Sequence, residues 1–413
     1  MKTYLVGGAV RDQLLGIAIK DRDWVVVGAT PEIMLDKGYK QVGADFPVFL
    51  HPTSQEEYAL ARTERKSGSG YQGFTVDFTQ DVTLEDDLVR RDLTINAMAQ
   101  DENGTIIDPF NGQQDLENKT LRHVSPAFAE DPLRVLRVAR FAARFHHLGF
   151  SVANETLQLM TQLSHSGELD NLTPERIWVE TQRALSEKSP WIYFKVLRDC
   201  QALKACFKEV DDLFGVPQTP IHHPEIDTGI HTLMVLEQAS ALSNDTEVRF
   251  AALVHDLGKA KTPKDNWPKH HAHENLGLKP IKQLCERLKV PNKHRELGLK
   301  VCEFHTHVHR AFELKATTIF KLFKQTDALR KPERFMQILL ACKADARGRP
   351  GFESIPYRQL DYLSYCLEQV QQVDNKAIAA SGLSGIEIGK AIEQAQLDAI
   401  KHAQQKRDLF QKP

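Results

Sequence analysis

The sequence has 413 residues, of which 41% are hydrophobic and 26% are charged. At roughly 150 residues per domain this length favours two or three domains, and the apolar fraction is too high for a disordered or fibrous chain. No stretch reaches the roughly 18 uninterrupted apolar residues of a membrane span, and the N-terminus lacks the apolar core of a signal peptide. Six scattered cysteines without a Cys-x-x-Cys pair speak against a disulfide framework or a structural zinc ribbon. We therefore expect a reduced, cytoplasmic enzyme with no membrane partner.

The charge is distributed unevenly along the chain. Overall, 53 Lys+Arg oppose 55 Asp+Glu, a net charge of −2. Residues 1–254 carry a net −12, residues 255–350 carry +11 and eight of the 17 histidines, and residues 351–413 carry −1. A basic segment of this kind suits a nucleic acid or phosphate ligand, and it also suits a solvated surface. Charge alone leaves both interpretations open.

Short apolar runs separated by glycine and proline fill the first 125 residues. In chain order they predict a strand at 4–6, a helix at 12–16, a strand at 24–27, a helix at 31–37 with Thr30 as N-cap, and strands at 47–50, 58–61 and 75–78. After Pro132 the apolar residues recur at helical spacing, and Thr173-Pro174 marks a further helix start. A Pro-rich break at 216–224 is the best candidate for a linker. The predicted fold class is α+β, with a small mixed-sheet head and an all-helical remainder.

Two acidic residues stand at the start of the predicted strand at 24–27. Asp21 and Asp23 are separated by one residue, so in an extended chain both side chains project to the same side. Paired carboxylates suit Mg²⁺, and two such ions about 4 Å apart can serve nucleotidyl transfer. Upstream, the Gly7-Gly8 turn and Arg11 could approach a phosphate. Taken singly, each of these motifs is also typical of an ordinary turn.

Three motifs together resemble one family. They are Gly7-Gly8-x-Val10-Arg11-Asp12, Lys20-Asp21-x-Asp23 and Arg90-Arg91-Asp92-x-Thr94-x-Asn96-Ala97, and matching residues continue to Arg140. Over residues 1–145 this series resembles the class II nucleotidyltransferases of the polymerase-β superfamily, which include the bacterial tRNA CCA-adding enzymes and poly(A) polymerases.

The resemblance implies roles for particular side chains of the head. It makes Asp21 and Asp23 the catalytic, Mg²⁺-binding carboxylates. It assigns nucleotide binding to Gly8, Arg11, Arg91 and Asp92. Glu64 and Asp77 are both candidates for a third metal-binding carboxylate, and the sequence does not choose between them.

The segment from Asp131 to Arg140 offers a means of selecting the nucleobase. Asp131 and Arg134 are three residues apart, so we expect both on one face of the helix that Pro132 opens. A carboxylate accepts from the exocyclic amine of cytosine or adenine and a guanidinium donates to the adjacent ring nitrogen, whereas uracil and guanine present the reverse order. The resemblance implies this role for the pair, and Arg137 and Arg140 extend the same face toward a triphosphate. A merely amphipathic helix with a basic face is the alternative.

A second set of metal-binding residues lies largely in the basic segment. His255-Asp256 follows an apolar run, His231 precedes it and Asp345 follows it. This order resembles the HD phosphohydrolase superfamily. The resemblance implies that the four side chains bind a divalent transition metal such as Ni²⁺, which activates water against a phosphoester.

Further histidines surround this motif. His305, His307 and His309 alternate, so we expect them on one face of an extended segment, with His305 as an additional site residue. His270, His271, His273 and Glu274 lie where some HD enzymes contact the metal ligands or a phosphate, and a surface or RNA-facing position is the favoured alternative for the histidines other than His305. A helical module that binds RNA without catalysis is the alternative for the whole tail.

Together the resemblances imply a CCA-adding enzyme of the gammaproteobacterial type, which uses CTP and ATP on the tRNA 3′ end and carries an HD domain with phosphatase, 2′-nucleotidase or 2′,3′-cyclic phosphodiesterase activity. The expected segments are a nucleotidyltransferase head at 1–140, a neck and body that bind nucleotide and tRNA at 141–220, the HD domain at 225–350 and a helical segment at 351–413, in a monomer or a homodimer. A poly(A) polymerase, or an HD phosphohydrolase with an RNA-binding head, is the alternative.

Overall fold

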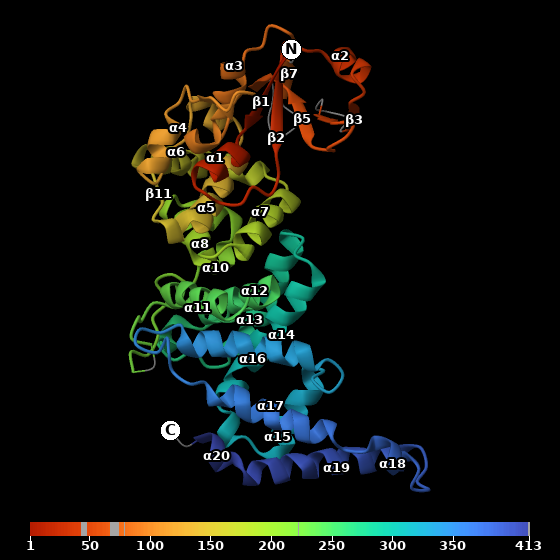
Figure 1. The fold of residues 1–413 in the computed structure, drawn as a ribbon. Coiled ribbons are helices and arrows are strands. Elements are labelled where there is room, and N and C mark those ends of the chain that lie inside the picture. The colour runs from red at the N-terminus through yellow and green to blue at the C-terminus, as the bar shows by residue number, and fades with distance from the viewer. Residues whose placement is uncertain (43–47, 67–73, 78, 222, 412–413) are drawn as a thin grey trace. The chain divides into compact units, whose positions relative to one another are not determined.

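The computed structural model describes residues 1–42, 48–66, 74–77, 79–221 and 223–411 (Figure 1). The chain divides into two units, Met1–Cys206 and Phe207–Pro413. Within the described residues, no helix combines the length and apolarity needed to cross a membrane. The predicted α+β class, with a mixed-sheet head and a helical remainder, is confirmed.

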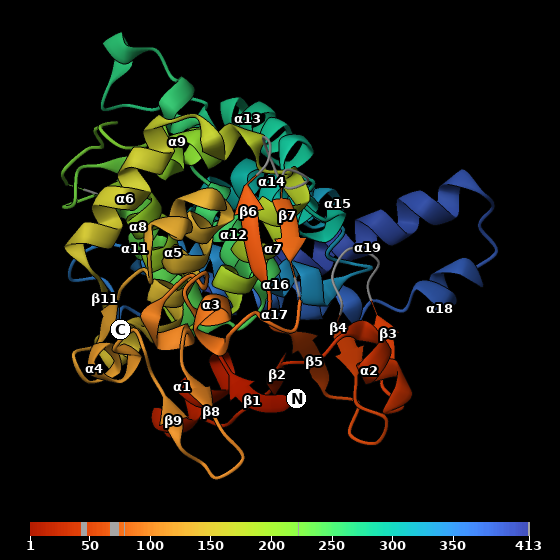
Figure 2. The same cartoon turned by 90° about the horizontal axis from the view of Figure 1, so that it is seen from above.

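A seven-stranded mixed sheet forms the head, and its strands follow one another along the lower edge of Figure 2. In spatial order they are β3 (Lys40–Val42), β4 (Val48–Leu50), β5 (Glu57–Leu60), β2 (Asp23–Val27), β1 (Lys2–Val6), β8 (Ala99–Gln100) and β9 (Ile106–Ile107). β2 and β5 run parallel, and the other neighbours are antiparallel. Val6 pairs with Asp23, so the glycine turn after β1 lies beside the acidic start of β2.

Short two-stranded pairs and nine helices complete the described part of the first unit. The pairs are β6 (Thr63–Lys66) with β7 (Phe74–Asp77) and β10 (Thr120–Leu121) with β11 (Ser151–Val152). The helices are α1 (Gly8–Leu14), α2 (Pro31–Asp36), α3 (Leu84–Leu88), α4 (Gly112–Glu117), α5 (Leu133–Phe145), α6 (Asn154–His165), α7 (Pro174–Ser186), α8 (Pro190–Asp199) and α9 (Ala202–Cys206). The predicted helix at 12–16 in fact begins at Gly8, because Gly7 takes a φ of 65° and starts the helix directly after β1.

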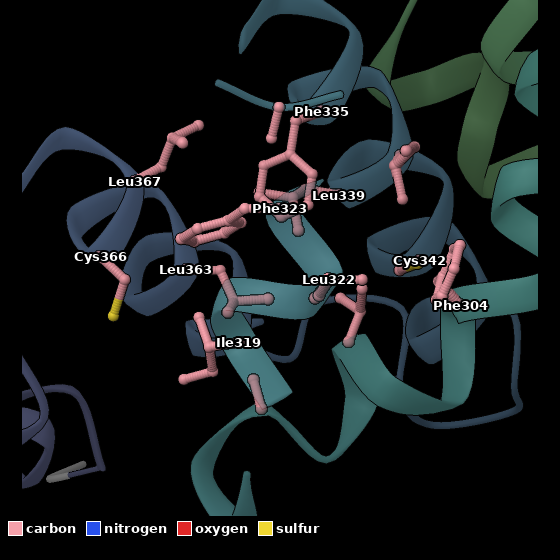
Figure 3. Close-up of a cluster of buried hydrophobic side chains, with 14 of the residues drawn as sticks. Phe304, Ile319, Leu322, Phe323, Phe335, Leu339, Cys342, Leu363, Cys366 and Leu367 are labelled. Atoms are coloured by element: carbon pink, nitrogen blue, oxygen red, sulfur yellow. The ribbon is translucent and has the colours of Figure 1, made fainter. Parts of the chain in front are cut away.

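The described part of the second unit is helical throughout. Its helices are α10 (Lys208–Asp211), α11 (Thr228–Leu242), α12 (Thr246–Val254), α13 (His273–Arg287), α14 (Asn292–His309), α15 (Ala316–Gln325), α16 (Pro332–Arg347), α17 (Arg358–Gln371), α18 (Asn375–Ala379), α19 (Ile386–Gln405) and α20 (Arg407–Gln411). One apolar cluster joins α12, α14, α15, α16, α17 and α19. Figure 3 shows its centre, where the rings of Phe323 and Phe335 meet edge to face with centroids 5.2 Å apart. Residues after 351 therefore share a core with the helices that precede them.

The segment favoured as a linker is part of the second unit's packing. Pro217 and Asp227 form a β-bridge, and the Gln218 backbone N–H donates to the Ile226 carbonyl at 2.6 Å. Gln218 is buried, and its side chain accepts from Lys259. The prolines thus shape a loop that folds back on the helical core, and the chain divides earlier, after Cys206.

Candidate active sites in the two units

A cavity of about 600 Å³ opens in the head beside the ends of β1 and β2. Nine arginines line it: Arg11, Arg62, Arg90, Arg91, Arg134, Arg137, Arg140, Arg144 and Arg176. Four aspartates accompany them: Asp23, Asp87, Asp92 and Asp131. This excess of positive charge suits a polyanionic ligand such as a triphosphate.

Gly7 and Gly8 bring the backbone to the cavity wall. A Cβ atom at Gly7 would lie 2.8 Å from Arg91 Nη1, and the φ of 65° also disfavours other residues there. Arg91 is held in place by Asp87, whose Oδ2 lies 3.1 Å from Arg91 Nη2. The glycine therefore lets a guanidinium approach the turn at the start of α1.

The two carboxylates predicted to bind Mg²⁺ differ in their surroundings. Asp23 lines the cavity at the first position of β2, whereas Asp21 precedes the strand and is not among the lining residues. Strand β2 begins at Asp23, and the shared orientation of the Asp21 and Asp23 side chains stays a prediction. Burial and the nearby charge of Asp21 raise the pKa of Asp23, although Arg91 acts in the opposite direction. A cation beside the two carboxylates would relieve this unfavourable charge.

The candidates for a third carboxylate fall on the pair β6 and β7. Thr63 pairs with Asp77 and Glu64 with Val76 in the backbone register. The side chains of Glu64 and Asp77 lie outside the described residues.

A buried network centred on Asp92 connects α1, α5 and the turn at Thr94–Asn96. Asp92 Oδ2 accepts from Arg137 Nε at 2.7 Å, and Asp92 Oδ1 accepts from Asn96 Nδ2 at 2.9 Å. Asn96 Oδ1 in turn accepts from Arg11 Nη1 at 2.5 Å. Burial alone would raise the pKa of Asp92, but the charge of Arg137 and these hydrogen bonds hold it well below its usual range. Asp92 is therefore an ionised anchor for the surrounding cations.

The arginines of α5 follow one helical face. Arg134, Arg137, Arg140 and Arg144 recur every three or four residues. Arg140 Nε donates to Glu180 Oε2 of α7 at 2.6 Å, and both side chains are buried. The Arg140 guanidinium also lies over the Phe141 ring, 4.4 Å from its centroid. Helix α5 thus carries positive charge along the cavity while internal partners fix its orientation.

Asp131 and Arg134 both line the cavity but bind other partners in this structure. Asp131 is extended (φ −117°, ψ 103°) and precedes α5, so the expectation of a shared helix face is wrong for this residue. Asp131 Oδ2 lies 3.1 Å from Arg176 Nη2. Arg134 donates to the backbone carbonyls of Ala127 and Arg90, at 2.7 and 2.6 Å. Each side chain keeps capacity for further hydrogen bonds, because a carboxylate has about four acceptor sites and a guanidinium has five N–H donors.

A second cavity, of about 690 Å³, lies in the second unit. Asp256 and Asp345 line it, and His231 and His255 lie beside them. His231 Nε2 lies 3.0 Å from Asp345 Oδ1, and His255 Nε2 lies 3.2 Å from Asp256 Oδ2 and 3.6 Å from Asp345 Oδ1. Four residues from a stretch of more than a hundred positions thus converge on one point.

The hydrogen bonds of the imidazoles orient their Nε2 atoms toward this point. His255 Nδ1 is 2.8 Å from the Ala252 carbonyl, and His231 Nδ1 is 3.0 Å from the Gly348 carbonyl. A carbonyl can only accept, so each Nδ1 carries a proton. Within the described residues, the buried atoms His255 Nε2 and Asp256 Oδ1 have no hydrogen-bond partner. Orphaned imidazole and carboxylate atoms of this kind fit a divalent transition metal.

The pKa values of the charged groups around this point also favour a bound cation. Burial lowers the pKa of His255, but the carboxylates of Asp256 and Asp345 outweigh it and raise the pKa to about 10. Burial acts to raise the pKa values of Asp256 and Asp345, yet the facing charge of His255 holds both well below their usual range. The two buried carboxylates thus demand positive charge, which a proton or a metal ion can supply.

A second set of potential ligand atoms adjoins the first. Asp256 Oδ1 lies 3.4 Å from His273 Nε2 and 3.8 Å from His305 Nε2, and the two Nε2 atoms are 3.1 Å apart. The Nδ1 atoms of His273 and His305 face backbone carbonyls at 2.8 and 2.9 Å. Two lone pairs therefore face each other beside a carboxylate, which requires a cation or an additional proton. His305 lies in the site as expected, whereas the surface assignment of His273 is wrong.

The segment that carries His305, His307 and His309 is helical, so the expectation of an extended segment is wrong. The period of α14 places His305 and His309, four residues apart, on one face. His309 Nε2 is 2.7 Å from Asp345 Oδ2, and the Tyr357 hydroxyl is 2.8 Å from His309 Nδ1. A helical reading of the alternating histidines would have identified His309.

Lys259 also belongs to the site, although sequence reasoning did not select it. Its Nζ lies 2.6 Å from Asp256 Oδ2, and the side chain is 9% exposed. The available signal was its position three residues after Asp256, which places it within one helical turn of that carboxylate.

We predict that Asp92→Asn lowers the stability of the head at pH 7 by about 2 kcal/mol, because it removes a charged partner of Arg137. A carboxylate with a lowered pKa stabilises the fold above its ordinary pKa, and that contribution is lost as the pH falls through the folded value. The difference in the free energy of unfolding between the variant and the wild type should therefore decrease below about pH 4. Urea unfolding between pH 7 and 3, with the exposed Asp36→Asn as control, measures this difference. A difference that stays constant to pH 3 would contradict this role of Asp92.

Comparison with known proteins covers both units. The family model "Poly A polymerase head domain" matches residues 3–122, "Probable RNA and SrmB- binding site of polymerase A" matches 149–214, and "HD domain" matches 228–345. Two solved structures share the fold. A CCA-adding enzyme in complex with ATP is 21% identical, covers 97% of this chain and 86% of that chain, and gives a TM-score of 0.65. The Thermotoga maritima CCA-adding enzyme complexed with tRNA is 20% identical, covers 100% of this chain and 92% of that chain, and gives a TM-score of 0.63.

A relative from Hahella chejuensis, named multifunctional CCA protein, is 62% identical over 98% of this chain and 96% of its own length. The match spans 405 residues and therefore includes both units. The chain therefore belongs to the family of multifunctional CCA proteins.

Proposed function

We propose that this chain adds CMP, CMP and AMP from CTP and ATP to the tRNA 3′ end and releases pyrophosphate. The presence of Asp23 in a cavity lined by nine arginines carries the proposal. Family membership over nearly the whole chain supports it, as do the solved relatives described in complex with ATP and with tRNA. The alternatives of a poly(A) polymerase, or of an HD phosphohydrolase whose head only binds RNA, are not favoured, because the match to the Hahella chejuensis multifunctional CCA protein covers 98% of this chain and the HD family model matches residues 228–345.

In the head, Asp21 and Asp23 would hold Mg²⁺ through their carboxylate oxygens. When bound, this ion supplies the positive charge that activates a 3′-hydroxyl and stabilises the leaving pyrophosphate. Arg91, held beside Gly7, is placed to bind the triphosphate, and Gly8 and Arg11 border the same space. Arg137 and Arg140 stay bound to Asp92 and Glu180 and contribute positive potential without needing to move.

Asp131 and Arg134 are proposed to select the base. Asp131 would accept from the exocyclic amine of cytosine or adenine, and Arg134 would donate to the neighbouring ring nitrogen. Uracil and guanine present the reverse order of donor and acceptor, so neither hydrogen bond to the base would form. In this structure Asp131 also contacts Arg176, and Arg134 also donates to the Ala127 carbonyl.

We expect Asp131→Ala and Arg134→Ala to lower the preference for CTP over UTP by tenfold or more, while addition retains its dependence on Mg²⁺. Single-nucleotide incorporation on tRNA that lacks its 3′ end measures the ratio. Arg183→Ala is the matched control, because this arginine is 61% exposed at its side chain and lies outside the cavity lining. Unchanged discrimination in both alanine variants would remove these residues from base selection. In the wild type, addition of C, C and A and nothing longer supports the proposed function, and a poly(A) ladder contradicts it.

The second cavity is proposed to hold the phosphohydrolase activity, with phosphatase, 2′-nucleotidase or 2′,3′-cyclic phosphodiesterase specificity. His231, His255, Asp256 and Asp345 would hold a divalent transition metal such as Ni²⁺, and Asp256, His273 and His305 offer a second position. The metal supplies a water of lowered pKa that can attack a phosphoester. His309 and Tyr357 orient the outer oxygen of Asp345 through two hydrogen bonds.

His255→Ala should abolish hydrolysis of 2′,3′-cyclic AMP and leave CCA addition within twofold of the wild type, because the two cavities lie in separate units. A strong chelator should remove both activities. Excess Ni²⁺ should then restore hydrolysis, and excess Mg²⁺ should restore CCA addition. Parallel loss of both activities in His255→Ala would show that the sites are not independent.

The setting proposed for this chemistry is the cytoplasm. All six cysteines are buried and none forms a disulfide, which suits a reducing compartment.

A further inference from the structure

Glu225 is a buried carboxylate in the loop that precedes α11, outside the metal-binding motif of the second unit. Its side chain is only 2% exposed. The next residue, Ile226, has a φ of 62°, a conformation that β-branched residues disfavour. The bridge between Pro217 and Asp227 and the hydrogen bond from Gln218 to the Ile226 carbonyl hold the loop in this form. The backbone thus accepts an unfavourable conformation while placing a carboxylate in the interior.

Two imidazoles converge on one oxygen of this carboxylate. Glu225 Oε1 lies 2.9 Å from His223 Nδ1 and 3.0 Å from His231 Nδ1. The rings of His223 and His231 meet edge to face, with centroids 4.7 Å apart. The contacts of Glu225 with titratable side chains in the described residues are these two histidines, and no arginine or lysine forms an ion pair with it there. Gln218 Nε2 also donates to Glu225 Oε1, at 3.5 Å, so the buried carboxylate faces two imidazoles and one amide.

The far side of His231 points into the metal-binding point. Its Nε2 lies 3.0 Å from Asp345 Oδ1 and 4.0 Å from Asp256 Oδ2. With Nδ1 between Glu225 and the Gly348 carbonyl, both neighbours accept, so the ring proton is fixed at Nδ1. The carbonyl alone would fix the tautomer, whereas a carboxylate also increases the electron density available at Nε2.

We propose that Glu225 is a positioning residue that holds His231 as a metal ligand and, through the same oxygen, holds His223 at the wall of the substrate cavity. The proposal rests on the proposed phosphohydrolase function of this site. His223 lines the cavity that contains Asp256 and Asp345, so one carboxylate joins the ligand set to the surface that meets the substrate. Displacement of Glu225 would loosen both imidazoles together.

The expected effect is a weaker metal site with an unchanged number of ions. Loss of a carboxylate that supports a ligating histidine typically lowers metal affinity about 10–100-fold. Glu225→Gln keeps the shape and one acceptor oxygen but removes the charge, so its loss should be smaller than that of Glu225→Ala. The number of ions bound at saturation should not change, because Glu225 supports a ligand and is not itself one.

The test uses the full chain carrying Asp21→Asn and Asp23→Asn, so that the head carboxylates do not contribute. Ni²⁺ affinity and stoichiometry are measured by competition with a chromophoric chelator for Glu225→Gln, Glu225→Ala and the control Glu303→Gln, whose partially exposed carboxylate pairs with Lys300. Circular dichroism and the thermal midpoint confirm folding. If Glu225→Ala does not fold, the isosteric Glu225→Gln decides the test.

The proposal is supported if Ni²⁺ affinity is equal in the wild type and Glu303→Gln, lower in Glu225→Gln and lowest in Glu225→Ala. Wild-type affinity in both Glu225 variants overturns it, and so does the loss of one bound ion, which would make Glu225 a ligand. His255→Ala serves as the separate test of the underlying site. If His255→Ala binds Ni²⁺ as tightly as the wild type, the assignment of the metal site is wrong. If His255→Ala loses Ni²⁺ binding while both Glu225 variants keep the wild-type affinity, only the role of Glu225 is rejected.

Discussion

The ionised, buried carboxylate of Asp92 is the interaction on which the head depends. It binds Arg137 of α5 and Asn96, and Asn96 binds Arg11 of α1, so segments more than a hundred residues apart are fixed around one charge. Arginines gathered at one cavity repel one another, and the repulsion grows as water is excluded. Asp92, together with Glu180, offsets that repulsion from behind while the front of the cavity stays positive. Rigid positive charge is what a site for a flexible triphosphate needs.

The second unit must instead stabilise buried negative charge. Asp256 and Asp345 are buried carboxylates, and their surroundings supply positive charge from His255, His309 and Lys259. Backbone carbonyls hold the Nδ1 protons of the ligand histidines, so the Nε2 atoms face the carboxylates. A metal ion fits this arrangement better than protons alone, because it can satisfy several Nε2 and carboxylate atoms at once.

The sequence predicted the elements with strong local signals and missed those decided by packing. Thr30-Pro31 and Thr173-Pro174 mark helix starts that the structure contains, because N-caps and proline act locally. The alternating histidines at 305–309 suggested an extended segment, but the segment is helical. Three alternating residues are too few to distinguish the period of a strand from that of a helix. Glu225 was missed, and a surface position was wrongly favoured for His273, because these residues approach His231 and Asp256 only through tertiary contacts. The partners of Asp131 and Arg134 could not be foreseen for the same reason.

The central claim is that one chain holds two chemically distinct metal-dependent centres. Crystals of the full chain grown with Mn²⁺ and a non-hydrolysable CTP analogue test it most directly, through the anomalous scattering of manganese. The account predicts one set of peaks beside Asp21 and Asp23 with the analogue's phosphates against the arginine wall, and another among His231, His255, Asp256 and Asp345. Manganese absent from either position, or a triphosphate bound away from the arginines, would contradict the account.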